Sequence, residues 1–254
     1  MPRTNKKAGR RMRGGNAAEI AKLGVRLALH RADVSIGRDP FVKRVARMLD
    51  HRGIDTVLDV GANVGQFARM VRGAGFDGDI LSFEPLSDAY RRLARRSSGD
   101  PRWQAFNVAV GSEPGRSTIH ISANSYSSSL LEMTNAHLDA APGSEFIGSE
   151  DVDVTTVAGI IEEHGLDPSR LFIKVDTQGF EKAVMAGAGA AIDKVAAVQL
   201  ELSFVELYEG QELFDEGVAT MNDHGLELWT LDPGISDVEG RLLQVDGVFV
   251  RATS

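Results

Sequence analysis

The most constraining feature of the sequence is a short apolar run that ends in glycines and passes directly into a helical pattern. Residues 56–60 read Thr-Val-Leu-Asp-Val, and Gly61 and Gly65 follow with Asn63 between them. Glycine allows a backbone to turn sharply and to lie close against a ligand. Glycines at a strand–helix junction indicate a nucleotide-type ligand above the carboxyl edge of a parallel sheet. We therefore expect an α/β fold with a ligand site at this junction.

The spacing of the two glycines argues against a dinucleotide as the ligand. The dinucleotide fingerprint needs G-x-G-x-x-G, whereas here three residues separate the glycines, and Gln66 and Phe67 follow. That spacing makes a poor cradle for a pyrophosphate. It resembles instead the first motif of methyltransferases that bind S-adenosylmethionine (SAM), a ligand without phosphates.

Beyond the junction, strand-like and helix-like segments alternate, which is typical of a parallel sheet with helices on both faces. Strands are predicted at residues 56–60, 79–83, 103–108, 117–122, 152–154, 171–175, 197–202 and 227–231. Helices are predicted at residues 16–31, 40–51, 64–74, 87–97, 155–161, 180–186 and 213–223. Two short runs, 242–244 and 247–251, predict a C-terminal hairpin. An antiparallel last strand on a mostly parallel sheet distinguishes the methyltransferase sheet from the dinucleotide-binding one.

Composition divides the chain into a tail, a cap and one large domain. Residues 1–15 hold six basic side chains and no acid, so we expect a disordered tail. Such a tail can also make a peripheral contact with an anionic membrane. The two helices within residues 16–53 predict an N-terminal helical cap, and residues 54–254 form the main domain. Its residues 123–150 are polar and weakly periodic, as in a functional loop or insert.

Charge and residue usage exclude several classes of function. Without the six basic residues of the tail, the total of 28 falls to 22, against 36 acidic residues. An acidic body disfavours nucleic acid as a partner. The absence of cysteine excludes disulfides and cysteine nucleophiles. There is no apolar run near the ~20 residues of a transmembrane segment, and no signal-peptide core, so we expect a cytoplasmic protein.

Six blocks in this order resemble the FkbM family of SAM-dependent O-methyltransferases. They are residues 57–65, 82–85, 107–111, 127–130, 173–181 and 245–250. The resemblance implies a Rossmann-like class I methyltransferase fold. It also implies methylation of a hydroxyl, typically on a sugar, a glycolipid or a polyketide-like natural product. The fifth block departs from the family's commoner Asp-x-Glu-Gly-x-Glu, because Gln178 replaces its first glutamate.

The first strand and its loop are expected to bind the amino-acid end of SAM. Gly61 and Gly65 would let the loop approach the methionine part. Asp59 and the backbone around Asn63 would orient the ammonium group. The structural alternative is that Gly61 and Gly65 are simple turn glycines.

The next two strand ends are expected to bind the nucleoside. Glu84 ends the second strand, where a carboxylate can accept hydrogen bonds from both ribose hydroxyls, and Pro85 fixes the turn beside it. Asn107 closes the third strand and can reach the adenine amino group, while Ala109 leaves room for the ring. An acid and an asparagine are also common at strand ends without any ligand.

Methylation of an alcohol requires alignment with the donor and removal of the hydroxyl proton. Asp176 and Glu201 end two neighbouring strands, at the edge toward which the methyl group should point. Either Asp176 accepts the proton with Glu201 as a positioning partner, or both ligate a Mg²⁺ ion that acidifies the hydroxyl. His120 and His137 are further candidates for the base.

Two alternatives to an O-methyltransferase of small-molecule or glycolipid acceptors remain. A nicotinamide (NAD)-dependent oxidoreductase of a related Rossmann fold is disfavoured by the missing third glycine and by the terminal hairpin. A catalytically silent SAM-binding protein is disfavoured by the presence of Asp176 and Glu84, although Gln178 leaves it open.

Overall fold

The computed structural model describes residues 40–122, 129–131, 133–134 and 145–252. The predicted tail, the predicted helix at residues 16–31 and most of the predicted insert lie outside these residues. The division into tail, cap and domain therefore stays a prediction.

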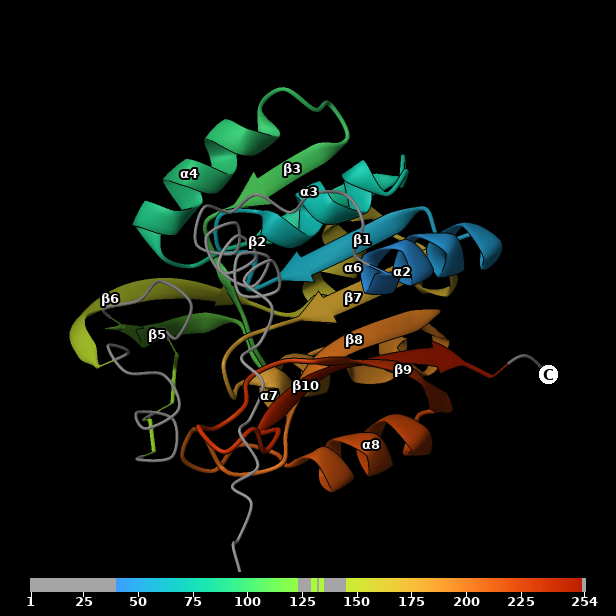
Figure 1. Ribbon diagram of the computed structural model, residues 1–254. Helices are drawn as coiled ribbons and strands as arrows, with labels where there is room; N and C mark the ends of the chain where they lie inside the picture. Colours follow the sequence, from blue (N-terminus) through green and yellow to red (C-terminus); the bar gives the residue numbers. More distant parts are fainter. Residues whose placement is uncertain (1–39, 123–128, 132, 135–144, 253–254) are drawn as a thin grey trace, which may run out of the picture. The chain divides into compact units, whose positions relative to one another are not determined.

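The main sheet has seven strands in the order β3-β2-β1-β7-β8-β10-β9 (Figure 1). Their bounds are Thr56–Val60 (β1), Asp79–Phe83 (β2), Trp103–Phe106 (β3), Leu171–Val175 (β7), Ala197–Ser203 (β8), Leu226–Pro233 (β9) and Gln244–Arg251 (β10). The first five strands of this order are parallel, and β10 is antiparallel to both of its neighbours. The predicted α/β fold with an antiparallel C-terminal strand is confirmed.

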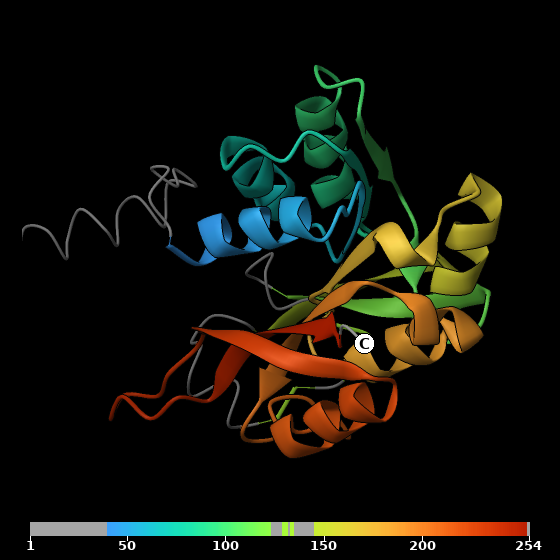
Figure 2. The same ribbon diagram turned by 90° about the vertical axis from the view of Figure 1, so that its right-hand side faces the viewer.

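Helices cover both faces of this sheet (Figures 1 and 2). One face packs against α2 (Pro40–His51), α3 (Gln66–Gly73) and α4 (Ser87–Ser97). The other packs against α6 (Val157–His164), α7 (Glu181–Ala186) and α8 (Phe214–Asp223). Short 3₁₀ turns, Pro168–Arg170 and Gly189–Lys194, precede β7 and β8. Every residue of β1 and β7 is buried because these central strands are covered on both sides, which explains their continuous apolar runs.

A second sheet of three strands has the order β4-β6-β5, with β4 (Ala109–Val110), β5 (Gly115–Ser122) and β6 (Phe146–Thr155). In Figure 1 it lies beside the arrowheads of β1 and β7. The predicted strand at 103–108 was too long, because β3 ends at Phe106 and the next strand, β4 of the second sheet, begins only at Ala109. The predicted insert at 123–150 was too long, because β6 begins at Phe146. The first half of β6 reads Phe-Ile-Gly-Ser-Glu and is mostly exposed, and its two apolar residues are adjacent, so it lacks the apolar alternation that marks a strand.

The predicted hairpin within residues 242–251 was wrong. Residues 244–251 form one strand, β10, in which Val245 and Asp246 pair with Leu202 and Glu201 of β8. The hairpin is formed instead by β9 and β10. Val245 is buried between the neighbouring strands, so the Val-Asp pair forms no turn.

Among the described residues, no helix is both long and apolar enough to cross a membrane.

Candidate active site

The loop after β1 is built by residues in left-handed backbone conformations. Gly61 has φ 72° and Gly65 has φ 84°, and Asn63, one of the few residue types that tolerate this region, has φ 48°. A Cβ on Gly61 would lie 1.9 Å from the backbone oxygen of Asp176, so only glycine fits there. The first loop therefore lies directly against the end of β7. The fold itself requires both glycines, and their contact with a cofactor stays a prediction.

Glu84 connects the ends of β1 and β2. Its carboxylate accepts hydrogen bonds from the backbone N–H groups of Asn63 (2.8 Å) and Leu86 (2.9 Å), one on each oxygen. Burial raises the pKa of Glu84 to about 7, although these two hydrogen bonds oppose the shift. Each oxygen keeps a second lone pair. The carboxylate can therefore still accept hydrogen bonds from two ribose hydroxyls, as predicted.

Asn107 and Ala109 lie beside Glu84. The side-chain nitrogen of Asn107 donates to the backbone oxygens of Glu84 (3.0 Å) and Pro85 (2.7 Å), so it fixes this turn. Ala109 is buried in a small apolar cluster with Val64 and Leu86. The structure thus brings together the predicted residues of the β1, β2 and β3 loops. With the Asn107 nitrogen engaged in the turn, its predicted contact with adenine would fall to the side-chain oxygen.

Asp59 lies beneath this loop rather than at its surface. Its side chain is fully buried, accepts a hydrogen bond from Ser82 (3.1 Å) and lies 3.7 Å from the Lys174 ammonium. Burial raises the pKa of Asp59, while Lys174 and Ser82 oppose that shift. The geometry favours an indirect role, in which Asp59 holds Lys174, over the predicted contact with the ammonium of SAM.

The two predicted catalytic acids meet at the edge formed by β7 and β8. Asp176 follows β7 directly, and Glu201 lies two residues before the end of β8. The side-chain nitrogen of Gln178 donates to both, at 2.9 Å to Asp176 Oδ1 and 2.8 Å to Glu201 Oε2. Lys174 Nζ donates to the other oxygen of Asp176 at 3.1 Å. Asp176 and Glu201 therefore belong to one hydrogen-bonded group.

Further acids surround this group. Burial, followed by the charges of Asp176 and Glu181, raises the pKa of Glu201 well above its usual value. Burial also raises the pKa of Glu181 to about 7, and that of Asp246 on β10 to about 6. The Glu181 carboxylate accepts hydrogen bonds from the backbone and hydroxyl of Thr177 (2.8 and 3.1 Å), so it shapes the turn that follows Asp176.

Sequence reasoning missed Lys174 and Tyr208 and did not assign a role to Gln178. A lysine inside the apolar run of β7 was a visible signal for a buried charge. His120, a candidate base, lies on β5 with its ring stacked on Phe146 at 4.9 Å between ring centroids. His137 lies outside the described residues.

The described residues do not fit the alternative Mg²⁺ site. A hydrogen-bond donor, the Gln178 nitrogen, lies between the two carboxylates that would have to share the ion. Across the described ranges, no cluster of three or more His, Asp or Glu side chains is arranged to hold a metal.

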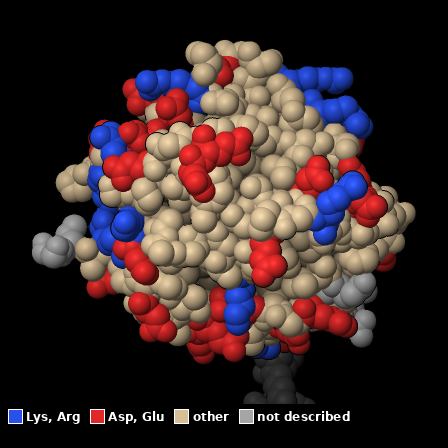
Figure 3. Space-filling view, turned by 180° about the vertical axis from the view of Figure 1, so that it is seen from behind, with Lys and Arg blue, Asp and Glu red and all other residues tan. Residues whose placement is uncertain are grey.

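Figure 3 shows acidic and basic side chains interspersed on one face of the molecule.

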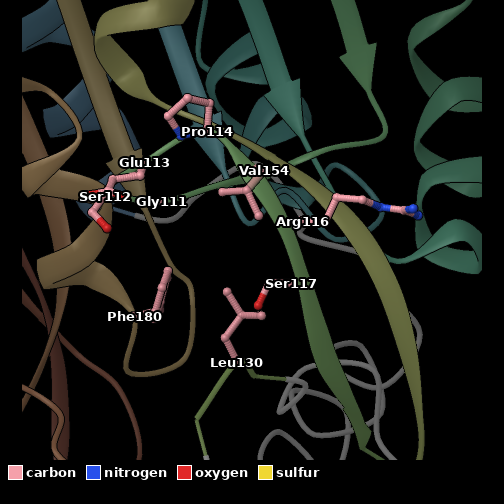
Figure 4. Close-up of a pocket in the computed structure, with 10 residues that line it drawn as sticks. Gly111, Ser112, Glu113, Pro114, Arg116, Ser117, Leu130, Val154 and Phe180 are labelled. Carbon is pink, nitrogen blue, oxygen red and sulfur yellow. The ribbon is translucent and has the colours of Figure 1, made fainter.

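A separate cavity of about 250 Å³ lies between the β4–β5 turn and the start of α7 (Figure 4). Phe180 and Leu130 form its apolar wall, opposite Pro114 and Val154. None of the predicted cofactor or catalytic residues lines it. It is therefore distinct from the carboxylate group, although Phe180 lies only two residues beyond Gln178.

The strand order, with one antiparallel strand inserted between β8 and β9, defines a Rossmann-like class I methyltransferase fold. A family model described as the methyltransferase FkbM domain matches residues 59–228. The chain therefore belongs to the FkbM methyltransferase family.

A curated relative is the "2-O-methyltransferase NoeI" of Sinorhizobium fredii (strain NBRC 101917 / NGR234), 30% identical over 162 residues. The match covers 61% of this chain and 66% of the relative, slightly under two thirds of that protein.

Solved structures show a weaker likeness. The magnesium protoporphyrin IX methyltransferase of Synechocystis PCC 6803 is 11% identical with a TM-score of 0.45, covering 87% of this chain and 83% of that one. TehB of Haemophilus influenzae is 9% identical with a TM-score of 0.47, covering 86% and 64%. At these scores neither adds to the assignment, which depends on the strand order and the family match.

Proposed function

We propose that this methyltransferase transfers the methyl group of SAM to a hydroxyl of a sugar, a glycolipid or a related natural product. The observation that carries the proposal is the contact between the loop after β1, where SAM is expected to bind, and Asp176 at the end of β7. The Gly61 loop lies against the backbone of Asp176, whose carboxylate is bound to Gln178 and Lys174. A donor held by the loop would therefore have a proton acceptor beside it.

Different residues would bind the cofactor and accept the proton. When bound, SAM supplies an activated methyl group, so the protein mainly aligns the reactants and excludes water. Glu84 would hold the ribose hydroxyls, with Asn107 near the base. Asp176 is partly exposed, with 35% of its side chain accessible, and would accept the proton of the hydroxyl. Glu201, which is bound to the same Gln178 nitrogen, would position the acceptor.

Two observations support a hydroxyl-bearing acceptor of this class. The site offers several carboxylate oxygens, which accept hydrogen bonds from hydroxyl groups. The curated relative is named a 2-O-methyltransferase. A cytoplasmic reaction, and a peripheral membrane contact through the basic residues 1–15 for a glycolipid acceptor, belong to the same proposal.

The direct test is incubation with isotopically labelled SAM and a panel of glycosides and glycolipid extracts, followed by mass spectrometry to locate the methylated oxygen. We expect label on a carbohydrate hydroxyl. Asp176→Asn should reduce turnover by roughly 10²–10⁴-fold while leaving cofactor binding nearly intact, because it removes the proton acceptor alone. Unchanged turnover would eliminate this role of Asp176.

Calorimetry separates the two alternative functions. We expect binding of SAM and S-adenosylhomocysteine and no binding of NAD. Tight NAD binding without a response to the sulfur ligands would indicate an oxidoreductase. Binding of the sulfur ligands, with no transfer to any member of a broad acceptor panel, would indicate a catalytically silent protein.

A further inference from the structure

Gln178 is held in place from both its backbone and its side chain. Its φ of 56° lies in the left-handed region, which is unfavourable for a residue of this type. The Ser129 hydroxyl donates to its backbone oxygen at 2.6 Å, and the Tyr208 hydroxyl donates to its side-chain oxygen at 2.8 Å. A Cβ on the following Gly179 would lie 2.8 Å from the Cβ of Tyr208, so the turn packs tightly against this ring. An unfavourable backbone conformation held by several contacts is typical of functional sites.

The side-chain amide has the donors and the acceptor that this position needs. An amide group has two N–H donors and one oxygen acceptor. Here the nitrogen donates to Asp176 and Glu201, and the oxygen accepts from Tyr208. An ionised glutamate would be isosteric but would have no donor for either carboxylate. The replacement of the family's commoner glutamate by Gln178 thus changes the chemistry and keeps the shape.

We propose that Gln178 is the positioning residue of the active site and that its amide joins Asp176 and Glu201 into one rigid pair. Tyr208 in turn fixes the orientation of the amide. This inference rests on the proposed function, because it assigns Asp176 the role of proton acceptor. It adds a residue that acts through Asp176 and Glu201 and need not touch the reactants.

The charges around Asp176 and Glu201 determine how a third carboxylate, placed at position 178, would affect their protonation. Lys174 on β7 is a cation within hydrogen-bond distance of Asp176. The acids that act on Asp176 or Glu201 come from several elements: Asp59 on β1, Glu181 on α7 and Asp246 on β10. Asp232 on β9 acts in turn on Asp246. An additional acid between Asp176 and Glu201 would therefore repel the ionised forms of both and favour their protonation.

Gln178→Glu tests the proposal through the pH profile of kcat. The rise of kcat that follows deprotonation of the acceptor group should move to higher pH by one unit or more, with the KM for SAM little changed. Tyr208→Phe keeps the ring and removes only the hydroxyl, and should reduce kcat about fivefold, equivalent to one hydrogen bond. Gln104→Glu adds the same charge at an exposed position on β3 and should leave both parameters unchanged.

A second readout does not need turnover. In protein with ¹³C-labelled Asp and Glu carboxyl groups, Gln178→Glu should raise the pH at which the coupled pair titrates, as followed by NMR. If Gln178→Glu does not fold, Tyr208→Phe takes its place, and unchanged kcat and pair titration in Tyr208→Phe would overturn the proposal. An unaltered titration and pH profile in folded Gln178→Glu would also overturn it. A shifted titration in protein that methylates no acceptor would support the positioning role and contradict the proposed function.

Discussion

At the scale of single residues, Lys174 is the least expected member of the site. It lies inside β7 with 8% of its side chain exposed, between the carboxylates of Asp59 and Asp176. Burial alone would lower the pKa of Lys174, but Asp176 and Asp59 together raise it above its usual value. The ammonium therefore stays charged and connects Asp59, which lies beneath the loop after β1, to Asp176, the proposed base.

Lys174→Met keeps the apolar stem and removes the charge. We expect the free energy of unfolding to fall by about 3–5 kcal/mol, because Asp59 would be left buried beside no cation. Chemical denaturation at pH 7 measures this change. Lys182→Met removes a lysine whose side chain is 71% exposed, and should change stability by less than about 1 kcal/mol. Equal effects of the two substitutions would contradict the structural role of Lys174.

Residues of the site could be predicted where they lie at or near a strand end; Glu201, predicted at the end of its strand, lies two residues before the end of β8. Glu84, Asn107 and Asp176 follow their strands directly, and the sequence places all three. The connection between Asp59, Lys174 and Gln178 could not be predicted. It depends on the pairing of β1 with β7 and on the direction of the Gln178 side chain in the turn after β7. The local pattern of apolar and polar residues shows neither.

At the scale of elements, the contact between the β1 loop and the end of β7 has a matched internal control. Gly61 and Gly210 share a φ of 72°, but a Cβ on Gly210 would meet nothing within 4 Å. We expect Gly210→Ala to lower the free energy of unfolding by about 1–2 kcal/mol, from backbone strain alone. Gly61→Ala adds a clash with a backbone oxygen and should cost at least about 2 kcal/mol more. Thermal and chemical denaturation compare the two, and similar losses would contradict the close contact.

Element prediction succeeded where burial imposes a pattern. The strands β1, β2 and β7 and the helices α2 and α4 have the predicted bounds, because each is marked by an apolar run or stripe with clear ends. Prediction missed the first half of β6, which is mostly exposed and has no alternation of apolar and polar residues. It also failed for the β9–β10 hairpin, where the assumed turn at Val245 and Asp246 is part of a strand between two neighbours.

At the scale of the whole molecule, the buried acids should determine how stability depends on pH. Burial raises the pKa of Glu84 and Glu181 from 4.5 to about 7, and that of Asp246 from 3.8 to about 6. Between the unfolded and folded values, the folded protein binds more protons than the unfolded chain. Raising the pH through this window removes those protons and lowers the stability of the fold.

We therefore expect the cofactor-free protein to be most stable near pH 5 and to lose stability toward pH 8. For Glu84 alone, a shift from 4.5 to about 7 corresponds to about 3 kcal/mol. Urea denaturation at pH 5, 6, 7 and 8 measures the slope. Glu84→Gln removes one of these titrations and should flatten the curve by up to about 1.4 kcal/mol per pH unit. A free energy of unfolding that rises steadily from pH 5 to pH 8 would show that these carboxylates are ionised and stabilising in the folded protein, contrary to the burial seen around them.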